Sequence, residues 1–416
     1  MDLKRFNYTE ILERDAQRGA SSPDVTIVMP CLNEIESLPH CIANALDALA
    51  LIRTELGMSG EIVIADNGST DGSQALATDL GARVVPVSRR GYGAALIGGC
   101  EAAAGRYIIM GDCDGSYNFT EGVAMIAKLD EGFELCMGNR FKGGIAPGAM
   151  PWKNRHIGNP GLTGVLNLFF RSGIGDAHCG LRGIRKESFT RLNLSGSGME
   201  FASEMVIKAA LLKLRIAEVP ATLSPDLRDR APHLRPWRDG WRHLRYLFML
   251  SPTWVFGVPS LMALMLSAVI FGVGLGYYTN VLSGVSFFGT SWSLVAGFLA
   301  TTGHFGLIMA VASHFYGVNR GYRLMRPTLR KYAGLFTLEA MLVSGIAAMM
   351  IGAGGLGAVT FGWSQGGFIA LDNPLPLILS AAIGAIGLQN IFGGFMLAII
   401  AGHESQLAPP SGAAGG

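Results

Sequence analysis

The stretch that decides the fold is YIIMGDCDGS, residues 107–116, in which four apolar residues run directly into a glycine and two aspartates. Such a short apolar run is typical of a buried strand. Similar runs occur at 25–30 (VTIVMP), 61–65 (EIVIA), 83–86 (RVVP) and 135–138 (LCMG). Helical patterns at 38–51, 73–80 and 93–104 lie between them. The alternation predicts an α/β fold, a mostly parallel sheet with helices on both faces.

Polar motifs follow these predicted strands at the point where each strand ends. Asn33 and Glu34 follow the first strand, Asp66 ends the second, and Asp112 and Asp114 follow the fourth. Ligands of parallel sheets bind beyond the carboxyl ends of the strands. The sequence therefore predicts a ligand site at this edge of the sheet.

Asp112 and Asp114 bracket Cys113 and are candidate metal ligands. Two carboxylates crowded at a strand end repel each other unless a cation joins them. Hard oxygen ligands suit Mg²⁺ or Mn²⁺, which bind substrate phosphates as well. The alternative is a D-x-D that is merely structural.

Two loops carry weaker signals. In DNGSTDGS, residues 66–73, a helix cap explains Asp71 or Ser73, whereas the position of Asp66 suits a hydrogen bond to a base or ribose. In the second loop, Gly91 and Gly93 precede a helix rich in small residues. Paired glycines let backbone N–H groups approach a phosphate at a helix N-terminus.

The charge distribution divides the chain into two parts. Residues 1–250 hold 28 Lys and Arg and 28 Asp and Glu, whereas residues 251–416 hold 5 and 3. The second part contains four segments long enough to span a bilayer, at about 252–279, 291–318, 332–361 and 374–401. Its five cations all lie in the link between the second and third segments. This composition excludes a wholly soluble enzyme, a disordered chain and a disulfide-stapled secreted module.

Arg and Lys stay on the cytoplasmic side of a membrane, so we expect both termini and the first part of the chain to be cytoplasmic. Residues 1–24 lack the apolar stretch of a signal peptide. The six cysteines form no zinc-site spacing, and we expect reduced, mostly buried thiols. Nothing in the sequence points to a nucleic-acid partner, and it leaves the oligomeric state open.

The ordered motifs together resemble the dolichyl-phosphate mannose synthase branch of glycosyltransferase family 2. The resemblance covers about residues 24–250. It rests on PCLNE (30–34), DNGSTDGS (66–73), GYGAA (91–95), DCDGS (112–116), GNRF (138–141), DAHCGLR (176–182) and GMEFASE (198–204).

The resemblance implies a nucleotide-diphospho-sugar transferase (GT-A) fold, a metal-dependent D-x-D and a C-terminal membrane domain. On this basis the nucleotide-sugar site comprises Pro30, Asn33, Glu34, Asp66, Gly91, Gly93, Asp112, Cys113 and Asp114. The acceptor-phosphate site comprises Arg140, Arg155, Asn159 and Arg182. The catalytic residues are Asp112, Asp114, Arg140 and Arg155, and the metal ligands are Asp112 and Asp114.

Three departures from the family pattern leave the sugar and the lipid open. The family often has G-K-G where this chain has Gly91-Tyr92-Gly93, so Arg89 or Arg90 replaces the lysine. Its T-S-G-F-R is HCGLR at 178–182, and its R-x-G-x-S-K loop is RAPHLR at 230–235.

The predicted function is inverting, metal-dependent transfer of one hexose from a nucleotide-diphosphate sugar to a polyprenyl phosphate at the cytoplasmic membrane face. GDP-mannose and UDP-glucose are the leading donors, and dolichyl or undecaprenyl phosphate is the acceptor. The alternatives are a membrane glycosyltransferase that makes another glycolipid or a polysaccharide, or a non-enzymatic lipid-carrier flippase or scaffold.

Glu200 and Glu204 lie one helical turn apart. This spacing suits contacts with sugar hydroxyls or the orientation of an arginine, and it suits a solvated helix face equally well.

Two apolar segments outside the predicted spans are candidates for contact with the bilayer. Residues 162–170 (LTGVLNLFF) suit either a core helix or a docking helix. Residues 236–250 combine Trp237 and Trp241 with Arg238, Arg242 and Arg245, as an interfacial helix does.

Taken together, the motifs and the charge distribution predict five segments. They are an N-terminal extension at 1–23, a catalytic domain at 24–230, an interfacial helix at 231–250, a membrane domain at 251–402 and a disordered tail at 403–416.

Overall fold

The computed structural model describes residues 22–227, 236–284 and 291–401, with the side chains of 236–239 and of 401 left out. The predicted tail, nearly all of the predicted N-terminal extension, and the loop 230–235 lie outside the described residues. Contacts within the chain divide it at Leu247–Phe248 into two compact units, a soluble unit and an apolar helical unit.

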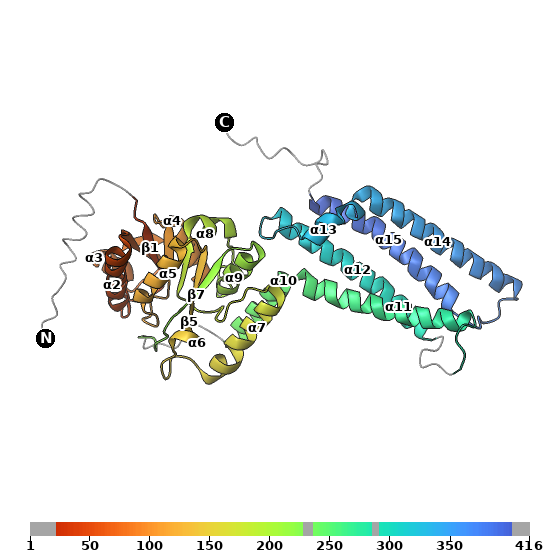
Figure 1. The fold of residues 1–416 in the computed structure, drawn as a ribbon, viewed down its shortest axis with the longest axis horizontal. Helices are drawn as coiled ribbons and strands as arrows, with labels where there is room; N and C mark the ends of the chain where they lie inside the picture. Colours follow the sequence, from red (N-terminus) through yellow and green to blue (C-terminus); the bar gives the residue numbers. More distant parts are fainter. Residues whose placement is uncertain (1–21, 228–235, 285–290, 402–416) are drawn as a thin grey trace, which may run out of the picture. The chain divides into compact units, whose positions relative to one another are not determined.

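The soluble unit is built on one seven-stranded sheet (Figure 1). Its strands are β1 (Val25–Cys31), β2 (Gly60–Asp66), β3 (Arg83–Pro86), β4 (Tyr107–Met110), β5 (Leu135–Asn139), β6 (Arg182–Arg185) and β7 (Ile216–Pro220). Their order in the sheet is β3-β2-β1-β4-β6-β5-β7. Only β6 runs antiparallel to its neighbours, so the predicted mostly parallel sheet is confirmed.

Helices cover both faces of the sheet. The helices of this part of the chain are α2 (Leu38–Leu56), α3 (Ser73–Asp79), α4 (Tyr92–Ala102), α5 (Gly122–Asp130), α6 (Arg140–Gly143), α7 (Asn159–Phe170), α8 (Lys186–Leu192), α9 (Phe201–Leu211) and α10 (Pro236–Met249), with short turns η1 (Phe119–Glu121) and η2 (Asn154–Gly158). Alternate residues of a strand face opposite sides. Accordingly Ile27 and Met29 of β1 pack in the core with α2, whereas Val28 faces α4.

In the described part of the apolar unit, four helices are long and apolar enough to cross a membrane, at Thr253–Tyr278, Trp292–Asn319, Leu338–Gln365 and Leu375–Ile400. They correspond to η3 (Thr253–Gly257) with α11 (Val258–Tyr278), then α12 (Trp292–Asn319), α14 (Leu338–Gln365) and α15 (Leu375–Ala401). The four predicted apolar segments are thus confirmed. The third begins six residues late, because α13 (Pro327–Lys331) and η4 (Ala333–Phe336) occupy the preceding residues.

These helices pack as two hairpins. The α11–α12 hairpin meets the α14–α15 hairpin mainly through α12 and α15. Small residues bring α14 and α15 together, since a Cβ on Gly352 would stand 2.7 Å from the Cα of Gly384. Close backbone approach of this kind is how small residues stabilise helix pairs in lipid.

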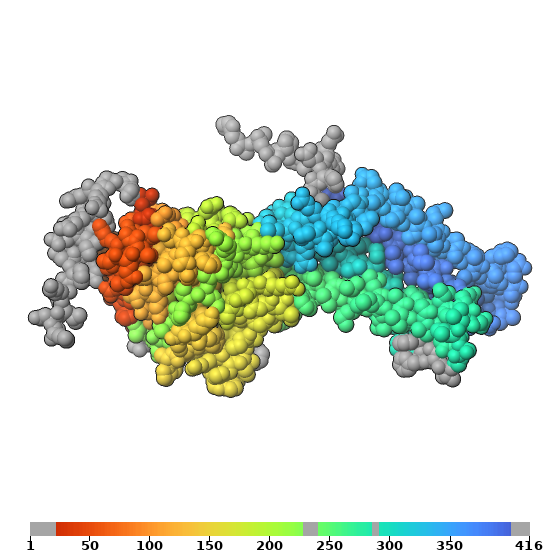
Figure 2. Space-filling view, viewed as in Figure 1, coloured from red at the N-terminus to blue at the C-terminus, as the bar shows by residue number. Residues whose placement is uncertain are grey.

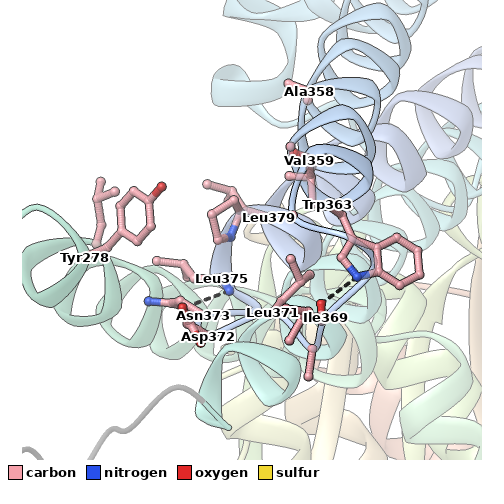
Figure 3. Close-up of a pocket in the computed structure, with 17 residues that line it drawn as sticks. Tyr278, Ala358, Val359, Trp363, Ile369, Leu371, Asp372, Asn373, Leu375 and Leu379 are labelled. Carbon is pink, nitrogen blue, oxygen red and sulfur yellow. Dashed lines mark hydrogen bonds between the residues drawn. The ribbon is translucent and has the colours of Figure 1, made fainter.

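A cavity of about 900 Å³ lies where α11, α14 and α15 meet the loop before α15 (Figure 3). The Trp363 indole closes one side and donates a hydrogen bond to the Ile369 carbonyl over 2.7 Å. Tyr278 and Asp372 also line the cavity. Its lining is otherwise mainly apolar.

Candidate active site

A cavity of about 410 Å³ opens at the carboxyl ends of β1, β2 and β4, where the sequence predicts a ligand site. Its lining residues are Pro30, Cys31, Leu32, Glu34, Asn67, Arg90, Gly91, Tyr92, Ala95, Asp112, Cys113, Asp114 and Met199. The structure therefore brings six of the predicted nucleotide-sugar residues onto one cavity: Pro30, Glu34, Gly91, Asp112, Cys113 and Asp114.

Both aspartates of the D-x-D motif line this cavity. Asp114 is 8% exposed, and its Oδ1 accepts hydrogen bonds from the Ser116 amide at 3.0 Å and hydroxyl at 2.5 Å. The Tyr92 hydroxyl is hydrogen-bonded to Asp112. Burial, followed by the charge of Asp112, raises the pKa of Tyr92, so the phenol stays protonated and donates. Asp112 therefore has a neutral hydrogen-bond donor beside it on the cavity wall.

The chemistry of these two carboxylates fits a divalent ion whose remaining ligands come from a substrate. Within the described residues no cluster of three or more His, Cys, Asp or Glu side chains is arranged to hold a metal alone. Mg²⁺ usually needs only one or two carboxylates, because water and substrate phosphates complete its shell. Asp112 and Asp114 meet that requirement on the wall of a cavity large enough for a phosphate group.

The β1 loop is held by contacts to the β2 loop. Asn33 has a positive φ of 58°, its amide donates to Ser69 Oγ at 2.9 Å, and its Oδ1 accepts from the Thr70 amide at 2.8 Å. Glu34 is 7% exposed, and its amide donates to Ser73 Oγ at 3.1 Å. Asn33 thus fixes the loop, while Glu34 reaches the cavity.

Asp66 lies behind the cavity. Its carboxylate accepts hydrogen bonds from the Gly68 amide at 2.9 Å and the Gln74 side chain at 2.6 Å. The turn itself therefore explains Asp66, contrary to the sequence argument that a cap accounts only for Asp71 or Ser73. The neighbouring Asn67 lines the cavity instead, and its Oδ1 accepts from the Gly91 amide at 2.7 Å.

Gly91 and Gly93 are required by the protein's own backbone. A Cβ on Gly91 would stand 2.1 Å from the Ser197 carbonyl oxygen, and one on Gly93 would stand 2.3 Å from that of Gly196. Gly91 also has a φ of 127°, which favours glycine. The two glycines thus allow the loop 196–198 to pack close to the backbone beside the cavity. The Gly91 amide donates a hydrogen bond to Asn67 and not to a ligand.

The two arginines beside the cavity have different partners. Arg90 lines the cavity and donates through Nη1 to the Asn67 carbonyl at 2.6 Å. Arg89 donates to the Ser195 carbonyl at 2.9 Å and does not line the cavity. Of the two proposed replacements for the family's lysine, Arg90 has the better position.

Two of the predicted acceptor-site arginines are buried in the protein. Arg140 makes a two-point ion pair with the fully buried Asp176, through Nε at 2.7 Å and Nη2 at 2.8 Å. Arg182 is 2% exposed and donates to the carbonyls of Cys179, Ala202 and Ala177. The Arg182 guanidinium thus ties the loop before β6 to the first turn of α9.

Arg155 and Asn159 lie on a surface. Arg155 is exposed in η2, and its side chain makes no hydrogen bond within the described residues. Asn159 begins α7 one turn later, and its Nδ2 donates to Met150 Sδ at 3.3 Å. Residues four apart share a helical face, so these two predicted acceptor residues are neighbours.

The two glutamates of GMEFASE do not form a solvated face. Glu204 is fully buried, pairs with Lys208 at 2.7 Å and accepts from the Gly196 amide at 2.7 Å. Glu200 follows the cavity-lining Met199, and its enclosed Oε2 has no hydrogen-bond partner within the described residues. Glu200 is thus the better candidate for a ligand contact.

Sequence reasoning missed Tyr92 and Asn67 as parts of the site. Both residues lie inside motifs that the sequence analysis identifies. In those motifs, however, the neighbouring glycines and aspartates are the residue types that indicate a ligand site. The signal for Tyr92 was its replacement of a lysine in an otherwise matching motif. Asn67 carried no separate signal, because its partners Val87, Arg89 and Gly91 are about 20 or more residues away.

The chain matches two family descriptions. Residues 26–192 match "Glycosyl transferase family 2". Residues 310–401 match "Glycosyltransferase family 2 C-terminal transmembrane region". The first match contains the sheet edge with Asp112 and Asp114, and the second contains the last part of α12 together with α14 and α15.

Similar proteins include several from Haloferax volcanii. A low-salt glycan biosynthesis hexosyltransferase is 33% identical over 383 residues, covering 90% of this chain and 89% of the relative. A dolichyl-phosphate hexose transferase is 25% identical over 197 residues, covering 47% of this chain and 81% of that protein. Among solved structures, glucosyl-3-phosphoglycerate synthase from Mycobacterium tuberculosis with Mn²⁺ and UDP is 18% identical, with a TM-score of 0.40, and covers 60% of this chain and 84% of that one.

Proposed function

Because the chain belongs to glycosyltransferase family 2, we propose that it transfers one hexose from a nucleotide-diphosphate sugar to a polyprenyl phosphate at the membrane surface. The observation that carries the proposal is the cavity at the sheet edge, lined by Asp112, Asp114 and Arg90, in a chain with four membrane-spanning helices. Relatives named as a hexosyltransferase and a dolichyl-phosphate hexose transferase support hexose transfer to a lipid carrier.

The donor lies in the cavity with its diphosphate toward Asp112 and Asp114. Pro30, Glu34 and Asn67 line the nucleotide side, and Arg90 contacts a phosphate through its guanidinium. When bound, Mg²⁺ or Mn²⁺ at the two aspartates neutralises the charge of the leaving diphosphate. Tyr92 keeps Asp112 oriented by donating a hydrogen bond to it.

The acceptor needs positioning more than activation. A polyprenyl phosphate is already an anion at neutral pH, so no strong general base is required. Arg155 and Asn159 hold its phosphate in line with the anomeric carbon. A single in-line displacement inverts that carbon, so an α-linked donor gives a β-linked product.

The exposed face of α7 supports access from a bilayer. Gly161, Gly164 and Leu168 of α7 continue a stripe that begins at Ile157 in η2, and Ile157 is 62% and Leu168 57% exposed. A Cβ at either glycine would meet nothing within 4 Å. Figure 2 shows the yellow stretch around 150–170 at the surface of the soluble unit.

Exposed cations flank this apolar stripe. Lys153 and Arg155 precede it and Arg171 follows it, with Trp152 67% exposed beside them. Apolar and aromatic side chains among cations are typical of a surface that rests on anionic headgroups. Of the two interpretations of residues 162–170, a docking helix is the one that we propose.

The helix α10 has the character of an interfacial helix. His243 and Leu247 face inward, whereas Trp241 is 61% exposed and Arg242 and Arg245 are exposed. Within the helical unit, Arg323 of the basic link donates to the carbonyl of Leu250, which lies near the start of that unit. The chain's entry and the basic link therefore lie at the same end of the helices, which supports a cytoplasmic catalytic unit and cytoplasmic termini.

The test is to incubate membranes containing the full chain with polyprenyl phosphate and, in separate reactions, radiolabelled GDP-mannose and UDP-glucose. We expect Mg²⁺- or Mn²⁺-dependent label in the lipid fraction from one donor, and none from membranes with Asp114→Asn. Label that enters a polysaccharide, or a different glycolipid without polyprenyl phosphate, would overturn the proposed acceptor.

A further inference from the structure

Two thiols lie side by side on the wall of the donor cavity. Strands β1 and β4 are parallel neighbours with Val28 opposite Met110, and three residues further along each chain are Cys31 and Cys113. The two thiols are in hydrogen-bond contact. The Cys113 thiol also donates to the carbonyl of Pro30 at 2.7 Å.

This pair differs from the other four cysteines. All six are free and buried, but Cys41, Cys100, Cys136 and Cys179 do not line the cavity. Only Cys31 and Cys113, among the described cysteines, combine a thiol neighbour with a position that a small solute in the cavity can reach.

We propose that Cys31 and Cys113 form a reversible oxidation site, which a peroxide converts to a disulfide that disables the donor site. Oxidation needs one equivalent of hydrogen peroxide. The Cys31 sulfur attacks the O–O bond, giving a sulfenic acid and one water. The Cys113 sulfur then attacks the sulfenic sulfur, a second water leaves, and the S–S bond forms. A dithiol reductant restores both thiols by exchange.

The disulfide acts on the site through the backbone between the two aspartates. Cys113 separates Asp112 from Asp114, and its carbonyl accepts a hydrogen bond from Ser37 Oγ at 2.6 Å. Disulfide formation removes the thiol that donates to Pro30 and draws Cys113 toward β1, because bonded sulfurs must approach to about 2.05 Å. Asp112 and Asp114 then lose their common orientation. This effect on transfer rests on the proposed function, whereas the disulfide itself does not.

The test treats the full chain in detergent with hydrogen peroxide, removes the peroxide with catalase, alkylates the remaining thiols and digests the protein. We expect mass spectrometry to find a peptide pair joined through Cys31 and Cys113, two hydrogens lighter than the reduced peptides. Transfer activity is measured in parallel, before and after dithiothreitol. Cys31→Ala and Cys31→Ser are the test variants, and Cys41→Ala is the matched buried control.

We expect the wild type and Cys41→Ala to lose transfer on oxidation and regain it with dithiothreitol, while both Cys31 variants keep the same transfer before and after peroxide. Sulfinic acid on Cys31 without the cross-link, or equal peroxide sensitivity in the Cys31 variants, would overturn the proposal. If no donor supports transfer even in the reduced protein, the mass spectrum still shows whether Cys31 and Cys113 form a disulfide. Failure of the proposed function and failure of this inference are therefore distinguishable.

Discussion

Arg140 and Asp176 form an ion pair closed to solvent, with Nε–Oδ2 at 2.7 Å and Nη2–Oδ1 at 2.8 Å. The Arg140 amide also donates to Asp176 at 3.1 Å. Asp176 thus fixes both the backbone and the side chain of a residue that the sequence places in the acceptor site. The pair gives Arg140 a structural role whether or not its remaining nitrogen, Nη1, meets a phosphate.

Asp176→Ala is expected to destabilise the soluble unit strongly, because it leaves the Arg140 charge buried without its partner. Breaking a buried pair in this way costs about 3–5 kcal/mol. Thermal unfolding of the solubilised protein measures the change. Lys128→Ala is the control, because Lys128 pairs with Glu131 on the surface and such pairs contribute about 0.2–1 kcal/mol. Equal midpoints for the two variants would contradict the structural role.

Arg155→Ala is expected to raise the KM for polyprenyl phosphate about 10-fold or more, since a hydrogen bond to a charged group contributes about 1.5–3 kcal/mol. The KM for the nucleotide sugar should change little, because Arg155 does not line the donor cavity. Initial rates with each substrate varied in turn measure both constants. Arg106→Ala, an exposed arginine paired with Asp24, is the control. An effect confined to the donor KM would count against the assignment.

Asp114→Asn is expected to reduce transfer about a thousandfold or more, since a catalytic metal contributes several kcal/mol. Chelation of divalent ions should reduce wild-type transfer to a similar level, and added Mg²⁺ or Mn²⁺ should restore it. Asp79→Asn, at an exposed position near the end of α3, is the control and should behave as wild type. Near-normal activity with excess chelator would refute a metal at this site.

The pH dependence of folding stability is expected to reflect the protonation of His178. Its Nδ1 is enclosed without a hydrogen-bond partner in the described residues, and Ser203 lies 3.3 Å from its Nε2 and 2.8 Å from His243. Burial, and then the nearby His243, Arg140 and Arg182, hold the pKa of His178 well below its ordinary value. Below about pH 6.5 the unfolded chain therefore binds a proton that the folded chain does not.

Stability should consequently fall as the pH drops below about 6.5, by at most about 1.4 kcal/mol per pH unit from this group. Above that pH neither state is protonated at His178, and the contribution is flat. Thermal unfolding between pH 7.5 and 5 measures the slope. His178→Asn should have a shallower slope than the wild type, whereas the exposed His40→Asn should keep it. Identical slopes in all three proteins would exclude His178 as the source.

The sequence predicts five of the seven strands, because each is a short apolar run. It misses β6 and β7, because a glycine in RGIR and a glutamate in IAEVP interrupt the apolar residues. Their strand conformation is decided by neighbours in the sheet. β6 pairs with β4 and β5, and β7 pairs with β5.

The site was predictable where topology alone sets position. Asp112 and Asp114 follow a strand of a parallel sheet, so they had to lie at its ligand-binding edge. The roles of Asp66 and Arg182 were not predictable, because their partners are backbone groups of turns and loops whose path a sequence pattern does not give. An aspartate or an arginine in a motif suggests a ligand contact equally well whether it binds substrate or a neighbouring carbonyl.

The pairing of the membrane helices has a consequence for how the chain can be divided. Since α11–α12 and α14–α15 are each self-contained hairpins that meet mainly through α12 and α15, that contact forms a single seam. Two separately synthesised fragments, cut in the link before α13, should therefore reassemble in one bilayer as complementing halves. The same seam offers a natural point for gene fission or for exchanging one hairpin between relatives.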